Sequence, residues 1–384
     1  MITTINNKHN KLNVPNLRFK EFQGEWKEYR IEDITENISS GRCKSHSSSG
    51  KYNLYGSTGI IGKTNEACYE GNLVLVARVG ANAGSLQILN EPCGITDNTL
   101  IIKPKEVDVQ YIYYFLQHFN LNRLIFGSGQ PLITGGMLKK VKVSLGTIQE
   151  QNKITRLLSI LDERIATQNK IIEKMQTLIK GLNDSLYELY GNGITTSFAE
   201  LGHSYSGLSG KTANDFGTGK PFITYLNVYS NNIINENDYQ YVRINEGEKQ
   251  NVVKYGDVLF TLSSETPEEV GVGSVFLGKE EVLLNSFCFG IHIENEEQVY
   301  SPYLSYYVSS TPFRKFIYPF AQGSTRFNLC KADFEKASIK LPLLENQIHI
   351  YAILNSIAEK IETEEMMLEK YLNQKQYLLR QMFI

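Results

Sequence analysis

The sequence has no long apolar run, no cysteine pair at metal-binding spacing and no excess of positive charge. Its 384 residues contain no stretch of 18 consecutive apolar residues, so we expect no membrane-spanning helix. Residues 1–14 are polar and rich in asparagine, without the apolar core of a signal peptide, and we expect a disordered leader. The five cysteines are odd in number and never form a CxxC pair. This pattern indicates reduced thiols in a cytoplasmic protein without a zinc site.

Catalytic and cofactor-binding motifs are missing as well. The six histidines form no HxxxH or HExxH pair, no serine lies in GxSxG, and no GxGxxG fingerprint occurs. No two prolines are adjacent, so the Asn/Asp-Pro-Pro-Tyr signature of an amino-methyltransferase is absent. The segment 59–64 resembles a phosphate-binding P-loop, but Ser57 stands where that motif needs its first glycine, which favours a glycine-rich hairpin. We therefore expect no metal ion, no bound cofactor and no self-sufficient catalytic site.

The charge balance does not by itself indicate DNA binding, because the formal net charge is only -2. The segment 15–145 contains 15 basic and 12 acidic residues, hence +3, whereas the segment 191–341 contains 12 basic and 17 acidic residues, hence -5. A DNA-binding protein with this balance must gather its cationic groups on one face or share the phosphate contacts with a partner.

A long heptad pattern is present twice. Apolar residues recur at alternating steps of four and three from Ile154 onward, interrupted at Gln168. The same spacing returns 196 residues later, interrupted at Glu364 and Lys375. The pattern predicts two long helices that bury these stripes on each other as a coiled coil. The predicted seam consists of Ile154, Leu158, Leu161, Ile165, Ile172, Met175, Ile179, Leu182, Leu186 and Leu189, and of Ile350, Leu354, Ile357, Ile361, Leu368, Tyr371, Leu378 and Met382.

The segments before the two helices follow one common order. Each has short β-like runs punctuated by glycine, then a helix with aromatic residues on one side, a glycine-bearing loop and a last strand. The loop glycines Gly127 and Gly323 differ by the same 196 positions as the helices, so the unit of domain plus helix is duplicated. We predict an α+β protein with a leader at 1–14, globular domains at 15–145 and 191–341, and long helices at 146–190 and 342–384.

Polar, glycine-bearing loops carry the side chains that could contact DNA. Arginine can bond guanine, asparagine or glutamine can bond adenine, and lysine or serine can bond phosphate. For any single residue, an ordinary solvent-exposed loop is an equally open interpretation. The candidates are Arg42, Lys44, Ser45, Lys51, Arg78, Asn82, Ser128 and Gln130 in the first domain, and Lys211, Asn214, Lys220, Thr224, Tyr225, Ser263, Arg326 and Asn328 in the second.

Four sets of short segments follow one another in a definite order: Arg18–Phe22 with Gly24–Trp26, Tyr55–Gly62, Gly71–Leu75 with Arg78 and Gly80 and its echo Gly256–Phe260, and Leu341–Gln347 with its first copy Leu145–Gln151. Together they resemble the DNA-specificity subunit of type I restriction-modification systems. The resemblance covers nearly the whole chain, and its strength lies in the combined order of the motifs. The junction before the first helix departs from the family pattern, because Gly146 stands where the second copy has Pro342.

The resemblance implies two target-recognition domains that each recognise one half of a split DNA sequence. It also implies antiparallel helices that set the gap between the half-sites, and a 36-residue helix spans about 54 Å. Two modification subunits with S-adenosylmethionine for adenine-N6 methylation, and restriction subunits with ATP and Mg, complete the family's complex. Two other interpretations stay open: a coiled-coil adaptor without DNA contact, and a stand-alone enzyme.

Overall fold

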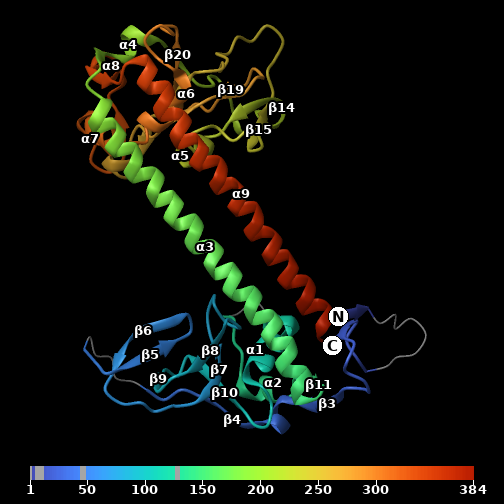
Figure 1. The fold of residues 1–384 in the computed structure, drawn as a ribbon. Helices are drawn as coiled ribbons and strands as arrows, with labels where there is room; N and C mark the ends of the chain where they lie inside the picture. The colour runs from blue at the N-terminus through green and yellow to red at the C-terminus, as the bar shows by residue number, and fades with distance from the viewer. Residues whose placement is uncertain (1, 5–12, 44–48, 126–129) are drawn as a thin grey trace. The chain divides into compact units, whose positions relative to one another are not determined.

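The computed structural model describes residues 2–4 (backbone only), 13–43, 49–125 and 130–384, which fall into two compact units (Figure 1). Unit 1 consists of residues 1–169 and 366–384, and unit 2 consists of residues 170–365. Three predicted DNA contacts, Lys44, Ser45 and Ser128, lie outside the described residues. Among the described residues, no helix is both long and apolar enough to cross a membrane.

Unit 1 is built on a four-stranded sheet of order β4-β10-β7-β8 and a three-stranded sheet of order β6-β5-β9. In the second sheet β5 and β9 run parallel, whereas β5 and β6 form an antiparallel hairpin. The strands are β1 (Ile2–Thr4), β2 (Leu17–Phe19), β3 (Lys27–Arg30), β4 (Thr35–Ser40), β5 (Tyr52–Gly56), β6 (Gly59–Thr64), β7 (Asn72–Ala77), β8 (Leu86–Asn90), β9 (Cys93–Ile95), β10 (Thr99–Pro104) and β11 (Lys142–Leu145).

Unit 2 repeats this architecture. Its four-stranded sheet has the order β13-β20-β16-β18, and its three-stranded sheet, of order β15-β14-β19, contains the parallel pair β14 and β19. The strands are β12 (Ile194–Thr196), β13 (Gly202–Ser206), β14 (Phe216–Ile223), β15 (Tyr239–Val242), β16 (Val258–Thr261), β17 (Ser263–Ser264), β18 (Gly273–Val275), β19 (Leu283–Leu284), β20 (Cys288–Ile293), β21 (Ala321–Gln322), β22 (Phe327–Leu329) and β23 (Ile339–Leu341).

Short helices cover the sheets and build the two cores. In α1, the Asp108 carboxylate accepts the Tyr111 amide at the N-terminus, and the buried aromatic face of the helix carries Tyr111, Tyr114 and Phe115. The equivalent helix of unit 2 is α6, with Tyr303, Tyr306 and Tyr307 buried. The short helices are α1 (Val109–Phe119), α2 (Gly135–Lys139), α4 (Phe198–Leu201), α5 (Tyr225–Ser230), α6 (Ser301–Tyr307), α7 (Thr311–Ile317) and α8 (Lys331–Lys336).

Two long helices, α3 (Ile148–Tyr190) and α9 (Leu344–Met382), carry the predicted heptad stripes. In unit 1 the beginning of α3 packs on the end of α9: Leu158 and Leu378 share one core, and Lys375 pairs with Asp162 at 2.6 Å. In unit 2 the end of α3 meets the beginning of α9, because Leu182 packs against the core that contains Leu354. The helices are therefore antiparallel, and the tandem α+β fold with two packed long helices is confirmed.

The predicted seam is largely buried, with one exception. Every seam residue is buried or half-buried except Leu189, which is 71% exposed, so the seam ends before it. The polar interruptions Gln168 and Glu364 are buried as well, at 6% and 8% exposure. The heptad spacing thus located the buried face even where it lacks an apolar residue.

Two local predictions differ from the structure. Within the expected disordered leader, β1 pairs antiparallel with β2, so this part of the segment forms a strand. One of the β-like runs expected in the second half is Phe222–Tyr225, and it is a strand only in part, because β14 ends at Ile223 and Tyr225 begins α5. The cause is Thr224, whose hydroxyl accepts the Asn227 amide at 3.1 Å and caps a helix that the β-like composition of the run conceals.

Candidate nucleic-acid interface

In unit 1, backbone hydrogen bonds bring separate loops together around Arg78. The Arg78 amide donates to the Asn98 carbonyl at 2.9 Å, and the Arg78 carbonyl accepts the Ile133 amide at 2.8 Å. The isolated bridge between Val79 and Leu132 continues this contact. The Arg78 Nε is buried without a hydrogen-bond partner among the described residues. A buried N–H without an acceptor is costly, and the Arg78 residue as a whole is half-buried beside these loops.

The β5–β6 hairpin lies beside these loops. The Ser57 hydroxyl donates to the same Asn98 carbonyl at 3.1 Å. The Gln87 amide donates to the carbonyls of Gly56 and Ser57 at 2.9 and 3.2 Å. These bonds fix the turn, so the hairpin end and Arg78 form one surface.

The other predicted residues of unit 1 that the structure describes are exposed. Arg42, Lys51, Asn82 and Gln130 all lie at the surface. The Lys51 ammonium stands 5.2 Å from the centre of the Tyr52 ring, a cation–π contact at the base of the hairpin. The structure brings Asn82 and Gln130 toward Arg78, because the Gly80 amide bonds the Pro131 carbonyl at 3.0 Å.

In unit 2, three of the predicted residues surround one hollow. Tyr225, Ser263 and Arg326 line a depression of about 670 Å³. The Tyr225 hydroxyl donates to the Ser263 carbonyl at 2.8 Å, and burial raises the pKa of this phenol. Asn328 lies next to the hollow, because it pairs with Ser263 between β17 and β22.

The hollow combines one free cation with anchored carboxylates. Arg326 is exposed, has no ion-pair partner among the described residues, and places its guanidinium 5.9 Å from the Phe287 ring centre. Glu269 accepts hydrogen bonds from Tyr229 at 2.8 Å and Ser264 at 3.0 Å. The bond from Tyr229 is the main reason that the pKa of Glu269 is lowered. The carboxylate therefore stays ionised and acts as a fixed acceptor, while Arg326 is the available donor.

The remaining candidates of unit 2 lie elsewhere or have internal partners. The Lys211 side chain is only 5% exposed and bonds Glu248 and the Arg243 carbonyl, which favours an internal role over DNA contact. Lys220 lines a different hollow of about 450 Å³, and Asn214 is exposed. Thr224 caps α5 and is half-buried.

The sequence prediction missed several exposed apolar side chains at these surfaces. Ile60 and Ile61 at the hairpin are 57% and 46% exposed, and Leu226 and Phe287 of unit 2 are 66% and 56% exposed. Leu226 lines the same hollow as Arg326. Their signal in the sequence is weak: large apolar residues stand within or next to a turn, where polar residues are usual.

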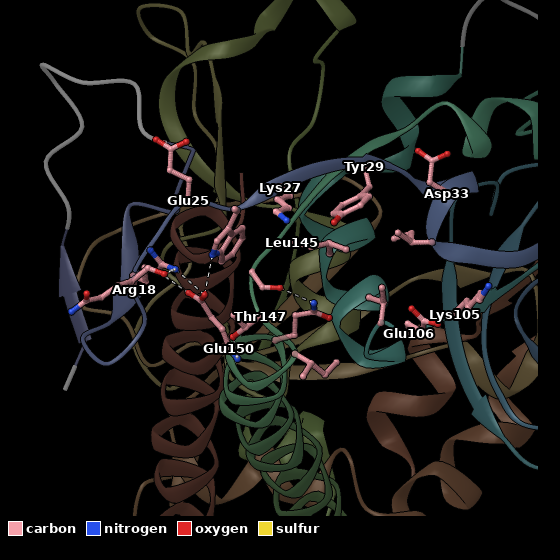
Figure 2. A pocket seen from close by; sticks show the side chains of 17 residues that line it. Arg18, Glu25, Lys27, Tyr29, Asp33, Lys105, Glu106, Leu145, Thr147 and Glu150 are labelled. Atoms are coloured by element: carbon pink, nitrogen blue, oxygen red, sulfur yellow. Dashed lines mark hydrogen bonds and ion pairs between the residues drawn. The ribbon is translucent and has the colours of Figure 1, made fainter.

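A separate pocket of about 470 Å³ lies where the N-terminal segment of unit 1 meets the start of α3 (Figure 2). Beside it, Arg18 bonds both oxygens of Glu150 at 2.7 and 2.9 Å, and the Trp26 indole donates to Glu150 at 3.1 Å. All three side chains are buried, and Trp26 belongs to the core of unit 1. None of the predicted DNA contacts that the structure describes lines this pocket, and the buried ion pair joins α3 to the N-terminal segment of unit 1.

The described residues hold no cluster of three or more histidine, cysteine, aspartate or glutamate side chains suited to a metal ion.

Comparison with known proteins identifies the architecture. The family model of the type I restriction modification DNA specificity domain matches residues 23–177 and 208–374. The MjaX specificity subunit assigned to Methanocaldococcus jannaschii is 26% identical over 300 residues, which cover 69% of this chain and 65% of that protein. The EcoprrI specificity subunit of Escherichia coli is 25% identical over 153 residues, 38% of each chain. The chain thus spans less than two thirds of the length of either relative.

Solved structures agree in fold. The S subunit of a type I restriction-modification system from M. genitalium aligns with a TM-score of 0.59 at 16% identity, over 97% of this chain and 99% of that one. A chain from a study of complex assembly and conformational transition in the type I system aligns with a TM-score of 0.57 at 15% identity, over 94% and 98%. Two matches to the domain model, one in each half of a duplicated fold, show that this chain belongs to the type I restriction-modification DNA specificity family.

Proposed function

We propose that this chain is the DNA-recognition subunit of a type I restriction-modification complex, in which each globular domain recognises one half of a bipartite target. The observation that carries the proposal is the double match to the specificity-domain model on a duplicated fold. The loops around Arg78 and the hollow around Arg326 support it, since each contains an arginine that forms no ion pair with a carboxylate within the described part of the chain.

In this proposal α3 and α9 act as a spacer between the half-sites and as the docking surface for two modification subunits. The 43 residues of α3 correspond to about 64 Å of helix. Exposed apolar residues away from the seam, such as Ile160 and Leu178 on α3, support docking on these helices.

The chain itself catalyses nothing in this scheme. Modification subunits supply S-adenosylmethionine and adenine-N6 methylation, restriction subunits supply ATP- and Mg-dependent cleavage, and the assembly works in the cytoplasm on double-stranded DNA. Unit 1 contacts one half-site and unit 2 contacts the other, because each unit has its own candidate interface.

Methylome sequencing tests the proposal. A host that carries this chain with its modification subunit is expected to methylate adenines in one split motif, and a host with the modification subunit alone is not. The alternative is a coiled-coil adaptor without DNA contact, which the same exposed helix residues would also suit. The adaptor predicts no sequence-dependent mobility shift of DNA even when the modification subunits are present, and that result would overturn our proposal.

A further inference from the structure

The exposed apolar residues of the two units occupy equivalent places in the duplicated fold. Strand β5 runs parallel to β9 in unit 1, and β14 runs parallel to β19 in unit 2. Ile60 and Ile61 follow the end of β5, and Leu226 follows the end of β14. The local structures differ, a hairpin in one unit and helix α5 in the other, yet both expose large aliphatic side chains at this place.

Two glycines and two hydrogen bonds fix the conformation of the β5–β6 hairpin, in which Ile60 and Ile61 are exposed. A Cβ on Gly56 would stand 2.9 Å from the Ile61 side chain, so glycine is what lets Ile61 lie across the hairpin. Gly59 has a φ of +124°, which other residues rarely adopt. With the bonds from Gln87 to the turn carbonyls, these features fix the tip before any partner binds.

Charge along the hairpin separates into two parts. The tip, residues 56–62, contains no charged side chain, whereas Lys51 and Lys63 stand at its base and Arg78 on the adjoining loop. A two-stranded β-ribbon fits the major groove of DNA, where its flanking cations can face phosphates and its tip faces base edges. The tip has no charged side chain to pair with phosphate, and its two exposed isoleucines can pack against an apolar base edge.

Unit 2 pairs the same two elements, an arginine and exposed apolar groups. Arg326 lines the hollow together with Leu226, and its guanidinium lies against the Phe287 ring. Phe287 stands between β19 and β20, and Asn98, which binds the hairpin of unit 1, stands between β9 and β10. Glu265 and Glu269 line this hollow and repel phosphate, which favours contact with bases there.

Building on the proposed function, we propose that Ile60 and Ile61 in unit 1, and Leu226 with Phe287 in unit 2, are specificity-determining contacts that recognise thymine. The C5-methyl group of thymine is the apolar feature that a base presents in the major groove. The neighbouring arginines Arg78 and Arg326 then recognise an adjacent guanine. Each half-site therefore contains at least one thymine whose methyl group is buried by these side chains.

Replacing thymine by deoxyuridine removes this methyl group and leaves base pairing intact, so the first test needs no change in the protein. The complex of this chain with its modification subunits is titrated with DNA duplexes that contain the target found by methylome sequencing. Each duplex carries deoxyuridine in place of thymidine at one position of that target. We expect one replacement in each half-site to weaken binding about fourfold, the value of one buried methyl group. Unchanged affinity at every thymine, or a half-site without thymine, would overturn the inference.

Variants then assign each contact to its unit. The double variant Ile60→Ser with Ile61→Ser should bind thymine and uracil equally in one half-site and still distinguish them in the other. Leu226→Ala should bind thymine and uracil equally in the second half-site and still distinguish them in the first. Ile88→Ser is the control, because Ile88 is a 37% exposed isoleucine on β8, and this variant should distinguish thymine from uracil in both half-sites. A double variant that keeps full discrimination in both half-sites contradicts the inference. If no bipartite target exists at all, the proposed function fails instead.

Discussion

At the scale of single residues, the most constrained charges of unit 1 are Arg18 and Glu150. Their side chains are 6% and 1% exposed, and Glu150 also accepts the Trp26 indole. Glu150→Gln leaves the Arg18 guanidinium without its carboxylate, and we expect a loss of about 3–5 kcal/mol in the free energy of unfolding. Urea unfolding followed by fluorescence measures it, because Trp26 is the only tryptophan.

A matched pair of variants separates charge from packing. Arg18→Met combined with Glu150→Leu removes both ions and should destabilise unit 1 less than Glu150→Gln alone. If the double variant is the less stable of the two, the hydrogen bonds and not the unpaired charge account for the loss.

His118 gives unit 1 a defined pH dependence. Its ring stacks on Phe383, with 5.8 Å between the ring centres, and burial lowers its pKa from the usual 6.5. The unfolded chain therefore binds the proton more readily, so the stabilising contribution is fully present above pH 6.5 and is lost as the pH falls through the lowered folded-state pKa. His118→Phe should reduce the dependence of the melting temperature on pH between pH 5 and 7.5. If the slope is unchanged in this variant, other groups cause the pH dependence.

Arg326 is the exposed arginine that lines the hollow of unit 2. Arg326→Ala should cost about 1–3 kcal/mol of binding and relax the sequence requirement at one position of one half-site, as mapped by methylome sequencing. Lys254→Ala is the control, because it removes the same charge from another exposed site of the unit. An equal loss on all DNA sequences would make Arg326 a phosphate contact only.

At the scale of elements, one glutamine in each unit ties the long helix to its domain. The Gln151 carboxamide accepts the Asp108 amide at 3.3 Å and donates to Gly146, and Gln347 accepts the Tyr300 amide at 2.9 Å and donates to Pro342. These amides stand at the start of α1 and α6, where the helix leaves its first N–H groups unpaired. The motif at the start of each long helix thus joins the helix to its domain through one glutamine, and we call these hydrogen bonds the clasp.

Loss of the clasp should therefore destabilise each unit separately. Gln151→Ala or Gln347→Ala leaves a backbone N–H without its acceptor, for which we expect about 1–3 kcal/mol. Hydrogen exchange should show faster exchange of the Asp108 or Tyr300 amide, confined to the unit that carries the change. Gln149→Ala, an exposed neighbour on α3, is the control. Equal protection in all three variants would refute the clasp.

Periodicity predicted the long elements because a buried stripe along a helix repeats over many residues. The seam from Ile154 to Leu186 and the aromatic face of α1 follow from spacing alone. Spacing did not predict the start of α5, since a single hydrogen bond to the Thr224 hydroxyl caps this helix. The candidate interfaces were predicted only as loops, because their assembly depends on contacts between distant segments, such as Ser57 with Asn98 and Tyr225 with Ser263.

At the scale of the whole molecule, the spacer proposal predicts a change in the length of the target. Deleting one heptad from each long helix, residues 171–177 of α3 and 360–366 of α9, preserves the seam and shortens each helix by about 10 Å. We expect the unrecognised gap to shrink by about three base pairs. Methylome mapping should find both half-sites unchanged; altered bases in the half-sites with an unchanged gap would refute the spacer.

Unit 1 is discontinuous in sequence, and this has a consequence for biosynthesis. Its core contains Leu378, Met382 and Phe383, whereas unit 2 is one uninterrupted segment. During translation the ribosome completes unit 2 before it supplies residues 366–384. Unit 2 can therefore complete its core first, whereas the core of unit 1 keeps part of its apolar surface uncovered until Leu378, Met382 and Phe383 have been synthesised.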